Sequence, residues 1–266
     1  MDKAESINVM GKYVIYTALV GKGYDNILQP KVVDNRFDYI CFVKKGDKKE
    51  DYNGVWRIEE IESDIIDNIR LSRYPKMIPG KTCLKEYKYS LYIDANIVIK
   101  DKFVYDRFIE LVLKEVPLAL LQHPHVDCVY QDAYIVIAGC RASWTDVIRQ
   151  ILFLKWKKYP THNGFYEANV IFRKNNDEEV LKFGEIWWKT FLRFSKRDQL
   201  SIVYALNESG LHPDYFLPQG YCARNHYAFE AVNHIKQKET FSLKIKKKIV
   251  AATISIFRKT LKDQIK

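Results

Sequence analysis

Short apolar runs separated by polar stretches recur along the first hundred residues. The first run, YVIYTALV at residues 13–20, is cut off by Gly21-Lys22-Gly23. A strand that is buried on both faces has this pattern, and glycines mark the loop at its end. Similar runs follow at residues 38–43, 55–58 and 90–94. The pattern therefore predicts a series of buried strands.

Stretches with the helical spacing of apolar residues lie between and after these runs, at residues 63–73, 102–115, 142–157, 178–194 and 199–208. Strands that alternate with helices form α/β domains with a mostly parallel sheet. No internal repeat, low-complexity tract or Pro/Gly-rich linker interrupts the chain before about residue 235. We therefore expect one α/β domain over residues 1–235 and a tail over residues 236–266.

Composition and charge narrow the class of protein. The chain has 266 residues, of which 47% are hydrophobic and 29% charged, as in a folded globular protein. The net charge is +10, but residues 236–266 hold ten Lys or Arg against two Asp or Glu, so the tail alone carries +8. The remaining +2 is too little for a domain that coats nucleic acid. We expect no nucleic-acid partner.

The cysteines and the apolar runs indicate a cytoplasmic protein. The five cysteines form no C-x-x-C pair and no zinc-finger spacing with histidine, which predicts reduced thiols. No apolar run approaches the roughly 20 residues that span a bilayer, and the N-terminal sequence is not that of a secretory signal. The sequence therefore predicts neither secretion nor a membrane span.

A carboxylate and an amide follow the run at residues 90–94, in the sequence Y-I-D-A-N. If the segment is extended, Asp94 and Asn96 point the same way at the carboxyl edge of the sheet, where open α/β folds bind ligands. These oxygen ligands suit Mg²⁺ or Mn²⁺ completed by substrate phosphates. The alternative is that Asp94 and Asn96 form a turn and cap a following helix.

The order of these segments resembles that of GT-A glycosyltransferases, in which a D-x-D motif at a strand end binds the metal. The segment T-A-L-V-G-K-G-Y-D resembles the first strand and loop that hold the nucleotide, which implies roles for Thr17, Gly21 and Tyr24. R-x-x-R-x-x-K resembles the basic helix beside the diphosphate. Its members are Arg70, Arg73 and Lys76.

Three later segments extend this resemblance. The first, G-F-Y-E-A-N-V-I-F, is similar to the acceptor-side strand and contains Glu167 and Asn169. The second, R-D-Q-L-S, contains Asp198 and resembles the acidic element that starts a helix under the reaction centre. N-H-Y lies where many GT-A enzymes supply a histidine to the metal, here His226. The resemblance implies a nucleotide-diphosphate sugar as donor, Asp94 as a ligand of its metal and diphosphate, and Mn²⁺ or Mg²⁺ as cofactor.

A narrower resemblance covers residues 13 to about 230. The ordered set Y-I-D-A-N, Q-H-P-H, Y-E-A-N-V-I-F-R, W-W and R-D-Q-L-S looks like bacterial surface-polysaccharide (capsule or O-antigen) transferases related to a plant mucilage-associated glycosyltransferase-like family. Asn96 departs from the GT-A pattern, because an amide replaces the second Asp. The loss of one charge implies weaker metal binding, or a metal that arrives mainly with the nucleotide.

Several of these residues have structural alternatives. The cations Arg70, Arg73 and Lys76 share one side of a helix and suit a diphosphate, or they form a solvated basic face. Asp198 either caps a helix or, with Glu167, binds or deprotonates an acceptor hydroxyl. His123 and His125 follow an apolar run at residues 118–121, either on the acceptor side or on a surface loop.

One tryptophan is a further candidate for the site, and the absence of several motifs excludes other classes of enzyme. Trp188 is a candidate to stack on an acceptor sugar, although at least one of the adjacent Trp187 and Trp188 is expected in the core. The sequence lacks G-x-G-x-x-G, the G-x-x-x-x-G-K-[ST] phosphate loop, G-x-S-x-G and H-E-x-x-H. These absences argue against a dehydrogenase, a P-loop kinase, a serine hydrolase and a zincin.

The tail forms a basic amphipathic pattern when it is wound as a helix. Seven cations fall within a sector of about 120°: Lys244, Lys247, Lys248, Arg258, Lys259, Lys262 and Lys266. The apolar residues lie across from them: Leu243, Val250, Ile254, Phe257 and Leu261. Such a helix lies on an anionic membrane, or it packs its apolar side on the domain.

Together these features predict a cytoplasmic glycosyltransferase that is peripheral on the inner face of the cell membrane. It moves a sugar from a nucleotide-diphosphate donor to a glycan or lipid-linked acceptor, with Asp94, Asn96 and His226 at the metal and Arg73 and Lys76 at the departing diphosphate. The alternative is a non-catalytic glycan- or nucleic-acid-binding module with a basic anchor.

Overall fold

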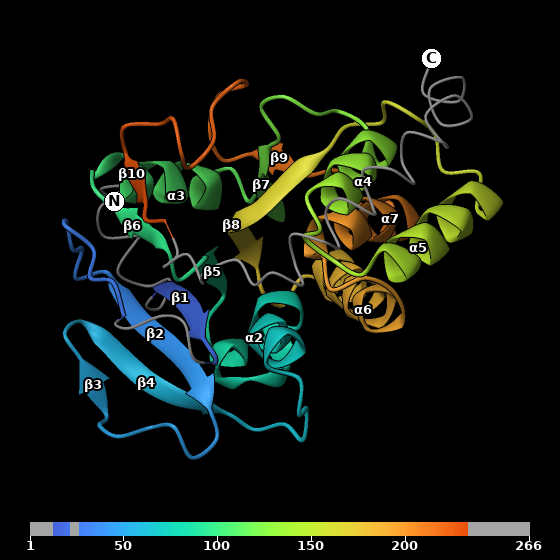
Figure 1. The fold of residues 1–266 in the computed structure, drawn as a ribbon. Helices are drawn as coiled ribbons and strands as arrows, with labels where there is room; N and C mark the ends of the chain where they lie inside the picture. The colour runs from blue at the N-terminus through green and yellow to red at the C-terminus, as the bar shows by residue number, and fades with distance from the viewer. Residues whose placement is uncertain (1–12, 22–26, 234–266) are drawn as a thin grey trace.

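The computed structural model describes residues 13–21 and 27–233. Its central feature is an eight-stranded sheet with the order β3-β4-β2-β1-β5-β8-β7-β9 (Figure 1). Pairing is parallel for β1 with β2, β1 with β5, β2 with β4 and β7 with β9, and antiparallel at the other three neighbours. The predicted α/β fold with a mostly parallel sheet is confirmed.

The strands of the first half match the apolar runs. The matching strands are β1 (Tyr13–Leu19), β2 (Phe37–Lys44), β4 (Trp56–Ile61) and β5 (Tyr89–Ile93), and the short exposed β3 (Tyr52–Asn53) was not predicted. The second half adds β7 (Leu118–Gln122), β8 (Tyr166–Lys174) and β9 (Asp214–Tyr215), and β6 (Ile97–Ile99) pairs with β10 (Phe229–Ala231) in a separate small sheet. Every residue of β5 is buried, as expected for a central strand.

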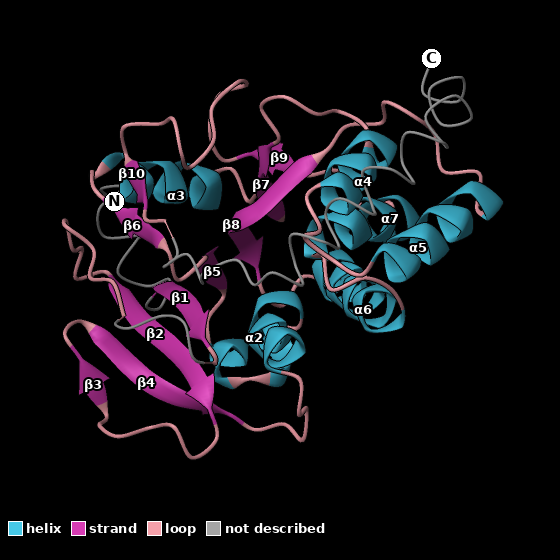
Figure 2. Cartoon of the chain, in the orientation of Figure 1, coloured by secondary structure: helices cyan, strands magenta, loops and turns pink. Residues whose placement is uncertain are grey.

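Helices cover both faces of the sheet (Figure 2). Alternate residues of β1 point to opposite sides, so Val14 and Tyr16 belong to one core cluster, whereas Tyr13 and Ile15 belong to the other. The first cluster packs against α2 (Asn68–Met77), α4 (Val129–Ala138), α5 (Trp144–Trp156), α6 (Glu178–Arg193) and α7 (Asp198–Ser209). The second packs against α3 (Phe103–Leu113).

Three local expectations were wrong. Helix α2 begins at Asn68 rather than at residue 63, because the Asp67 carboxylate caps it by accepting from the Arg70 backbone N–H. Residues 95–96 form a turn instead of an extended segment, and the strand β6 follows them rather than a helix. Helix α4 was not predicted, because its sequence VYQDAYIVIA lacks a clear apolar periodicity.

Two short 3-10 helices, η1 (Pro79–Lys81) and η2 (Cys83–Glu86), connect α2 to β5. None of the helices among residues 13–21 and 27–233 combines the length and the apolar character that crossing a bilayer requires. The predicted basic amphipathic helix at residues 236–266 lies outside the described residues, as does Tyr24.

Candidate active site

Lys76 is the centre of a cluster of charged side chains at the carboxyl end of β5. We call Arg73, Lys76, Asp94 and Asp198 the Lys76 cluster. The Lys76 side chain is only 1% exposed, and its Nζ donates to Asp198 Oδ2 at 2.6 Å and lies 3.3 Å from Asp94 Oδ1. A buried ammonium group is tolerated only with such partners. The cluster therefore joins α2, the β5 end and α7.

Asp198 is held as a carboxylate. Burial is the largest influence and by itself raises the pKa of Asp198, but the charges of Lys76, Arg73 and Arg197 outweigh it and hold the pKa well below the usual range. The Arg73 Nε lies 3.5 Å from Asp198 Oδ2. Asp198 is the first residue of α7, after the N-cap Arg197, and its Oδ1 accepts from the Gln199 backbone N–H at 3.0 Å. A structural role at the start of the helix therefore stands beside the ion pair with Lys76.

The spacing of cations along α2 explains which of them reach this cluster. Arg73 and Lys76 are three residues apart and so share one side of the helix, facing Asp198. Arg70 does not join them, because its guanidinium donates to the backbone carbonyl of Leu192 at the end of α6. Two of the three predicted diphosphate cations therefore lie together, and the third ties α2 to α6.

Aromatic hydroxyls support the cluster from the core side. The Tyr92 hydroxyl donates to Asp94 Oδ1 at 2.7 Å, and the Lys76 Nζ lies 4.9 Å from the centroid of the Tyr92 ring. Burial is the main reason that the pKa of Tyr92 is raised well above its ordinary value, so the hydroxyl keeps its proton and remains a donor. Tyr92 packs edge-on against Tyr16, whose hydroxyl accepts from the buried Arg173.

Glu167 on β8 anchors a second cluster, the Glu167 cluster, which consists of His123, Asp132, Glu167, Asn169 and Arg224. Glu167 Oε1 accepts from Arg224 at 2.7 Å, and its Oε2 accepts from the Asn169 side chain at 3.0 Å. Pairing of β7 with β8 shifts register between Leu120 and Leu121, directly beside these residues. Such irregularities re-aim side chains near functional sites.

A backbone bond holds the two clusters together. The Asp94 N–H donates to the Asn169 carbonyl at 2.9 Å, so the β5 end and the middle of β8 are in direct contact. Asn169 also presents a buried side-chain oxygen that has no hydrogen-bond partner among the described residues. Because an unpaired buried acceptor costs about 1–3 kcal/mol, this oxygen favours the approach of a donor such as a ligand hydroxyl.

His123 and Asp132 complete the second cluster. The His123 Nδ1 accepts from the backbone N–H groups of His125 and Val126, which leaves the proton of a neutral ring on Nε2. Burial lowers the pKa of His123, although the charges of Glu167 and Asp132 oppose this shift. Burial likewise raises the pKa of Asp132, against the charges of Arg197 and His123. Both shifts are therefore towards the neutral form.

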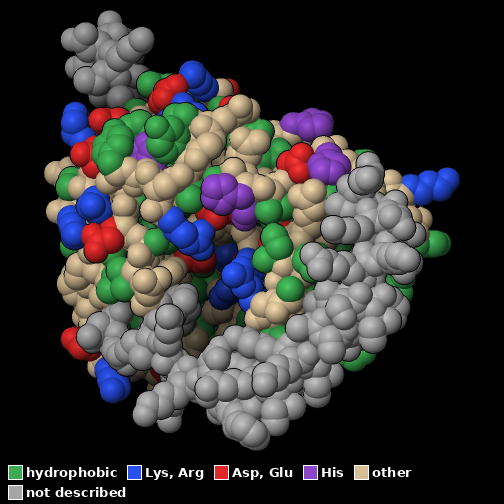
Figure 3. All heavy atoms as spheres, turned by 45° about the horizontal axis from the view of Figure 1, so that its top comes forward, with side chains coloured by type: hydrophobic (Ala, Val, Ile, Leu, Met, Phe, Trp, Pro, Cys, Tyr) green, Lys and Arg blue, Asp and Glu red, His purple; other side chains and the backbone are tan. Residues whose placement is uncertain are grey.

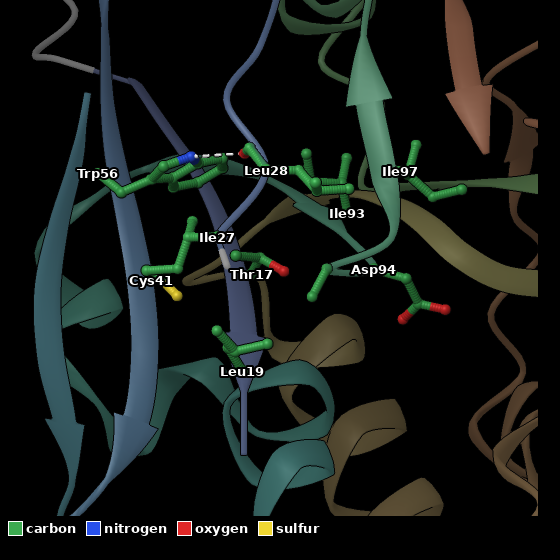
Figure 4. Close-up of a pocket in the computed structure, with 10 residues that line it drawn as sticks. Thr17, Leu19, Ile27, Leu28, Cys41, Trp56, Ile93, Asp94 and Ile97 are labelled. Atoms are coloured by element: carbon green, nitrogen blue, oxygen red, sulfur yellow. Dashed lines mark hydrogen bonds between the residues drawn. The ribbon is translucent and has the colours of Figure 1, made fainter. Parts of the chain in front are cut away.

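A mostly apolar hollow lies beside the Lys76 cluster. It runs from β1 to the β5–β6 turn (Figure 4), with Thr17 and Asp94 as its polar members. Its other lining residues are Leu19, Ile27, Leu28, Cys41, Trp56, Ile93, Ala95 and Ile97. The Trp56 indole donates to the Leu28 carbonyl, which fixes the ring at one wall. The Thr17 hydroxyl oxygen is buried without a hydrogen-bond partner among the described residues.

The predicted metal ligands have partners within the protein. The Asn96 amide nitrogen donates to the Val232 carbonyl, and the His226 ring packs against Phe103 and stacks on Tyr227 while its Nδ1 accepts from the Ala228 N–H. Over residues 13–21 and 27–233, no group of three or more His, Cys, Asp or Glu side chains forms that could hold a metal ion. Metal binding by Asp94, Asn96 and His226 therefore stays a prediction.

Other predicted residues lie outside the two clusters. Trp188 packs edge-on against Tyr74 of α2 and stacks on Phe191, so it joins helices rather than lining the site. His125 is exposed, with its ring centroid 6.4 Å from that of His123. Gly21 has a φ of +97°, which a side chain rarely adopts, and a Cβ there would lie 3.3 Å from the Asn68 amide nitrogen.

The structure also reveals charged residues that sequence reasoning missed. Asp132 was missed together with helix α4, and Arg197 was noted only as the neighbour of Asp198. Arg224 is 57 positions from its partner Glu167, a separation that gives no local signal. In Figure 3, basic and histidine side chains gather around a hollow in the middle of the face, with acidic atoms deeper inside. This face combines the charges of a site for an anionic, hydroxyl-bearing ligand.

Comparison with protein families gives a match over most of the chain. The family model for TOD1/MUCI70, glycosyltransferase-like domain, matches residues 2–217, which include Asp94, Glu167 and Asp198. A comparison with curated proteins finds no match. The mostly parallel sheet and its helices are those of a Rossmann-like glycosyltransferase fold. Because the match covers most of the chain, the protein belongs to the TOD1/MUCI70 glycosyltransferase-like family.

Proposed function

We propose that this protein transfers a sugar from a nucleoside diphosphate sugar to a hydroxyl group of a glycan or lipid-linked acceptor. The acceptor oxygen bonds to the anomeric carbon while the bond from that carbon to the diphosphate oxygen breaks. The electron pair of that bond leaves with the nucleoside diphosphate, and the hydroxyl proton passes to a protein carboxylate. The proposal extends family membership to a specific reaction.

The observation that carries this proposal is the junction of the two clusters through Asp94 and Asn169. One side of the junction offers cations and the other a carboxylate with a free acceptor beside it. A transferase needs these two functions next to each other, because the departing diphosphate and the incoming hydroxyl act on the same carbon.

Arg73 is the residue we propose to contact the donor diphosphate. Its side chain is 28% exposed and its 3.5 Å contact to Asp198 is loose, so a diphosphate oxygen can compete for the guanidinium. Lys76 is buried and fully engaged, and it acts by holding Asp94 and Asp198 in place. We place the nucleoside at the carboxyl end of β1, where open α/β sheets bind nucleotides. The hollow beside Thr17 is too small to enclose it, because it has room for only about one water molecule.

Glu167 is the carboxylate we propose to orient and deprotonate the acceptor. Asp198 is a poor base, since the surrounding cations hold its pKa well below the usual range. Glu167 is paired with Arg224, whose side chain is 63% exposed and whose contact is therefore weak enough for an acceptor hydroxyl to displace. Asn169 and His123 then lie beside the incoming sugar as hydrogen-bonding groups.

We assign no reaction step to a metal ion. The Asn96 amide nitrogen and the His226 Nδ1 are hydrogen-bonded to backbone groups, and Asp94 is paired with Lys76 and Tyr92. A divalent cation is expected to reach Asp94 only as the counter-ion of the donor diphosphate. In this proposal the protein's own cations supply the fixed positive charge at the leaving group.

The proposal is tested with a panel of nucleotide sugars and purified protein. A donor that binds the native state must raise the melting temperature, and slow release of nucleoside diphosphate without acceptor would report bond cleavage. The variant Glu167→Gln should retain the thermal shift and lose transfer, whereas Arg73→Gln should lose the shift. Thermal stabilisation by glycans alone, with no response to any nucleotide sugar, would favour the binding-module alternative.

A further inference from the structure

Helix α5 exposes a continuous apolar face on the outside of the molecule. Trp144, Ile148, Leu152 and Trp156 recur at every fourth residue and therefore form one ridge along the helix. Their exposed fractions are 55%, 41%, 61% and 74%. The opposite side of α5 is buried against the core through Val147, Gln150 and Leu154. The ridge is thus additional to the apolar surface that folds the helix.

Aromatic rings at both ends and cations along the rim give this ridge a distinct chemistry. Indole rings favour the boundary between water and lipid, because the ring is apolar and its N–H is polar. Residues 141–158 contain five Lys or Arg and one Asp or Glu. Arg149 is largely exposed, and the Lys157 Nζ lies 5.3 Å from the centroid of the Trp156 ring. The apolar ridge therefore has a positive border.

We propose that the exposed face of α5 docks on an anionic lipid surface, with the two tryptophans entering the headgroup region. The charges favour this partner over a second copy of the chain, because a contact between two identical ridges would bring the net +4 of residues 141–158 against the same charge. Residues 236–266 are disfavoured as the partner of the ridge for the same reason, because they carry +8. An anionic lipid surface can do both: its headgroups neutralise the positive border, and its apolar interior covers the ridge.

The position of α5 links this surface to the site. Helix α5 lies at the outer edge of the helical layer (Figure 1), and it ends at Trp156, ten positions before β8 begins with Tyr166. β8 carries Glu167 and Asn169. Docking through α5 would therefore anchor the segment that leads into the acceptor side. The inference itself rests on lipid binding and stands whether or not the proposed transfer reaction is correct.

Tryptophan fluorescence tests the proposal directly in the full chain. The five tryptophans are Trp56, Trp144, Trp156, Trp187 and Trp188. Trp56 and Trp187 are buried in the core, whereas the two tryptophans of the ridge are exposed. Vesicles of phosphatidylglycerol and phosphatidylcholine should shift the emission to the blue, and brominated lipid chains should quench it. Vesicles of phosphatidylcholine alone should do neither, and added salt should weaken the effect.

Cosedimentation with the same vesicles measures the contribution of the ridge. The pair Trp144→Ser and Trp156→Ser should weaken binding on the order of tenfold or more, because two indole rings no longer enter the lipid. The matched control is Ile66→Ser with Leu113→Ser, which removes two exposed apolar residues elsewhere and should bind as the wild type does. Both pairs change exposed side chains, so both proteins should melt near the wild-type temperature.

Three results would overturn the proposal. The first is a wild-type protein that does not bind anionic vesicles. The second is equal binding by the Trp144/Trp156 variant without quenching in the wild type, which would assign lipid binding to another segment such as residues 236–266. The third is a change of oligomeric state in the Trp144/Trp156 variant, which would make the ridge a contact between copies of this chain.

Discussion

The Lys76 cluster and the Glu167 cluster lie side by side, and each contains both acidic and basic residues. They differ in how fully their polar atoms are paired. In the first, the buried Lys76 ammonium binds two carboxylates, and a tyrosine hydroxyl satisfies one of them. In the second, Asn169 Oδ1 and Asp132 Oδ2 are buried with no hydrogen-bond partner among the described residues. Both carboxylate oxygens of the buried Asp198 in the first cluster accept hydrogen bonds within the protein, whereas these two buried acceptors of the second cluster do not.

This difference indicates a structural role for the first cluster and a ligand-binding role for the second. A fully paired buried cluster holds its side chains in one arrangement, and removing one member leaves an uncompensated charge. Unpaired buried acceptors are costly in the free protein and are satisfied when a hydroxyl-rich ligand enters. The Lys76 cluster therefore serves as a rigid support that presents Arg73 and Asp94, while the Glu167 cluster receives the acceptor.

Replacing Lys76 with Met should have the largest effect. Because two carboxylates lose their buried cation, we expect the free energy of unfolding to fall by about 3–5 kcal/mol, together with loss of transfer. Denaturant unfolding followed by circular dichroism measures the change. The matched control is Lys189→Met, which removes an exposed lysine of α6 paired with Glu185 and should cost about 0.5 kcal/mol or less. Similar costs for the two variants would contradict a structural role for Lys76.

Replacing Glu167 with Gln should separate activity from stability. The amide oxygen still accepts from Arg224, so unfolding should stay within about 1 kcal/mol of the wild type. Transfer should fall by about 10²–10⁴-fold, because the group that takes the proton is lost. Initial rates at saturating donor measure this loss, with Glu185→Gln on the surface as control. Transfer at the wild-type rate would remove Glu167 from the chemistry.

Asn substitutions of Asp198 and Asp132 should change stability in opposite directions. The pKa of Asp198 is lowered in the folded protein, so its ionised form stabilises the fold above pH 4 and this contribution is lost as the pH falls. Asp198→Asn should therefore destabilise the protein by about 2–4 kcal/mol at pH 7 and less in acid.

The pKa of Asp132 is raised in the folded protein, so its ionisation weakens the fold as the pH rises through that pKa. Asp132→Asn should consequently be more stable than the wild type at pH 8, with the difference shrinking as the pH falls. Unfolding of both variants over pH 3–8 measures the pattern. Parallel pH profiles would show that the two carboxylates share one environment.

Asn96 should give the smallest effect. Its side chain donates one hydrogen bond to the Val232 carbonyl, so Asn96→Ala should cost about 0.5–1.5 kcal/mol and leave transfer near the wild-type rate. Asn96→Asp places a carboxylate at the same turn and sharpens the test of the metal assignment. Calorimetric titration with Mn²⁺ should detect no added metal affinity in this variant, whereas a clear gain would restore Asn96 as a ligand position.

The sequence predicted much of the fold because buried strands and amphipathic helices leave local patterns. The β1 run and the α6 periodicity are of this kind, and both elements formed within a few residues of expectation. Helix α4 was not predicted, because it is apolar on most sides and its N-cap residue, Cys128, makes no side-chain capping bond. The turn at residues 95–96 was the alternative that the local sequence offered for Asp94 and Asn96, whereas the pairing of β6 with the distant β10 has no local signal.

The site residues likewise include some that a local pattern indicated and others that only tertiary packing brings to the site. Arg73, Lys76 and Asp198 were found from spacing and resemblance, and the structure brings them together. The separation of Arg70 from them depends on the end of α6, 122 positions away. The pairing of Glu167 with Arg224 and the approach of Asp132 to His123 likewise arise from tertiary packing. Local spacing identifies candidates, but long-range packing decides which of them share a site.

The most direct test of the account is calorimetric binding of nucleoside diphosphates to the wild type, Arg73→Gln and Glu167→Gln. The account predicts that at least one nucleoside diphosphate binds the wild type and Glu167→Gln with similar affinity. It predicts that Arg73→Gln binds this ligand at least tenfold more weakly, because a charge-assisted bond to the diphosphate is lost. Equal affinity of all three proteins, or loss of binding only in Glu167→Gln, would contradict the division of the site into a diphosphate side and an acceptor side.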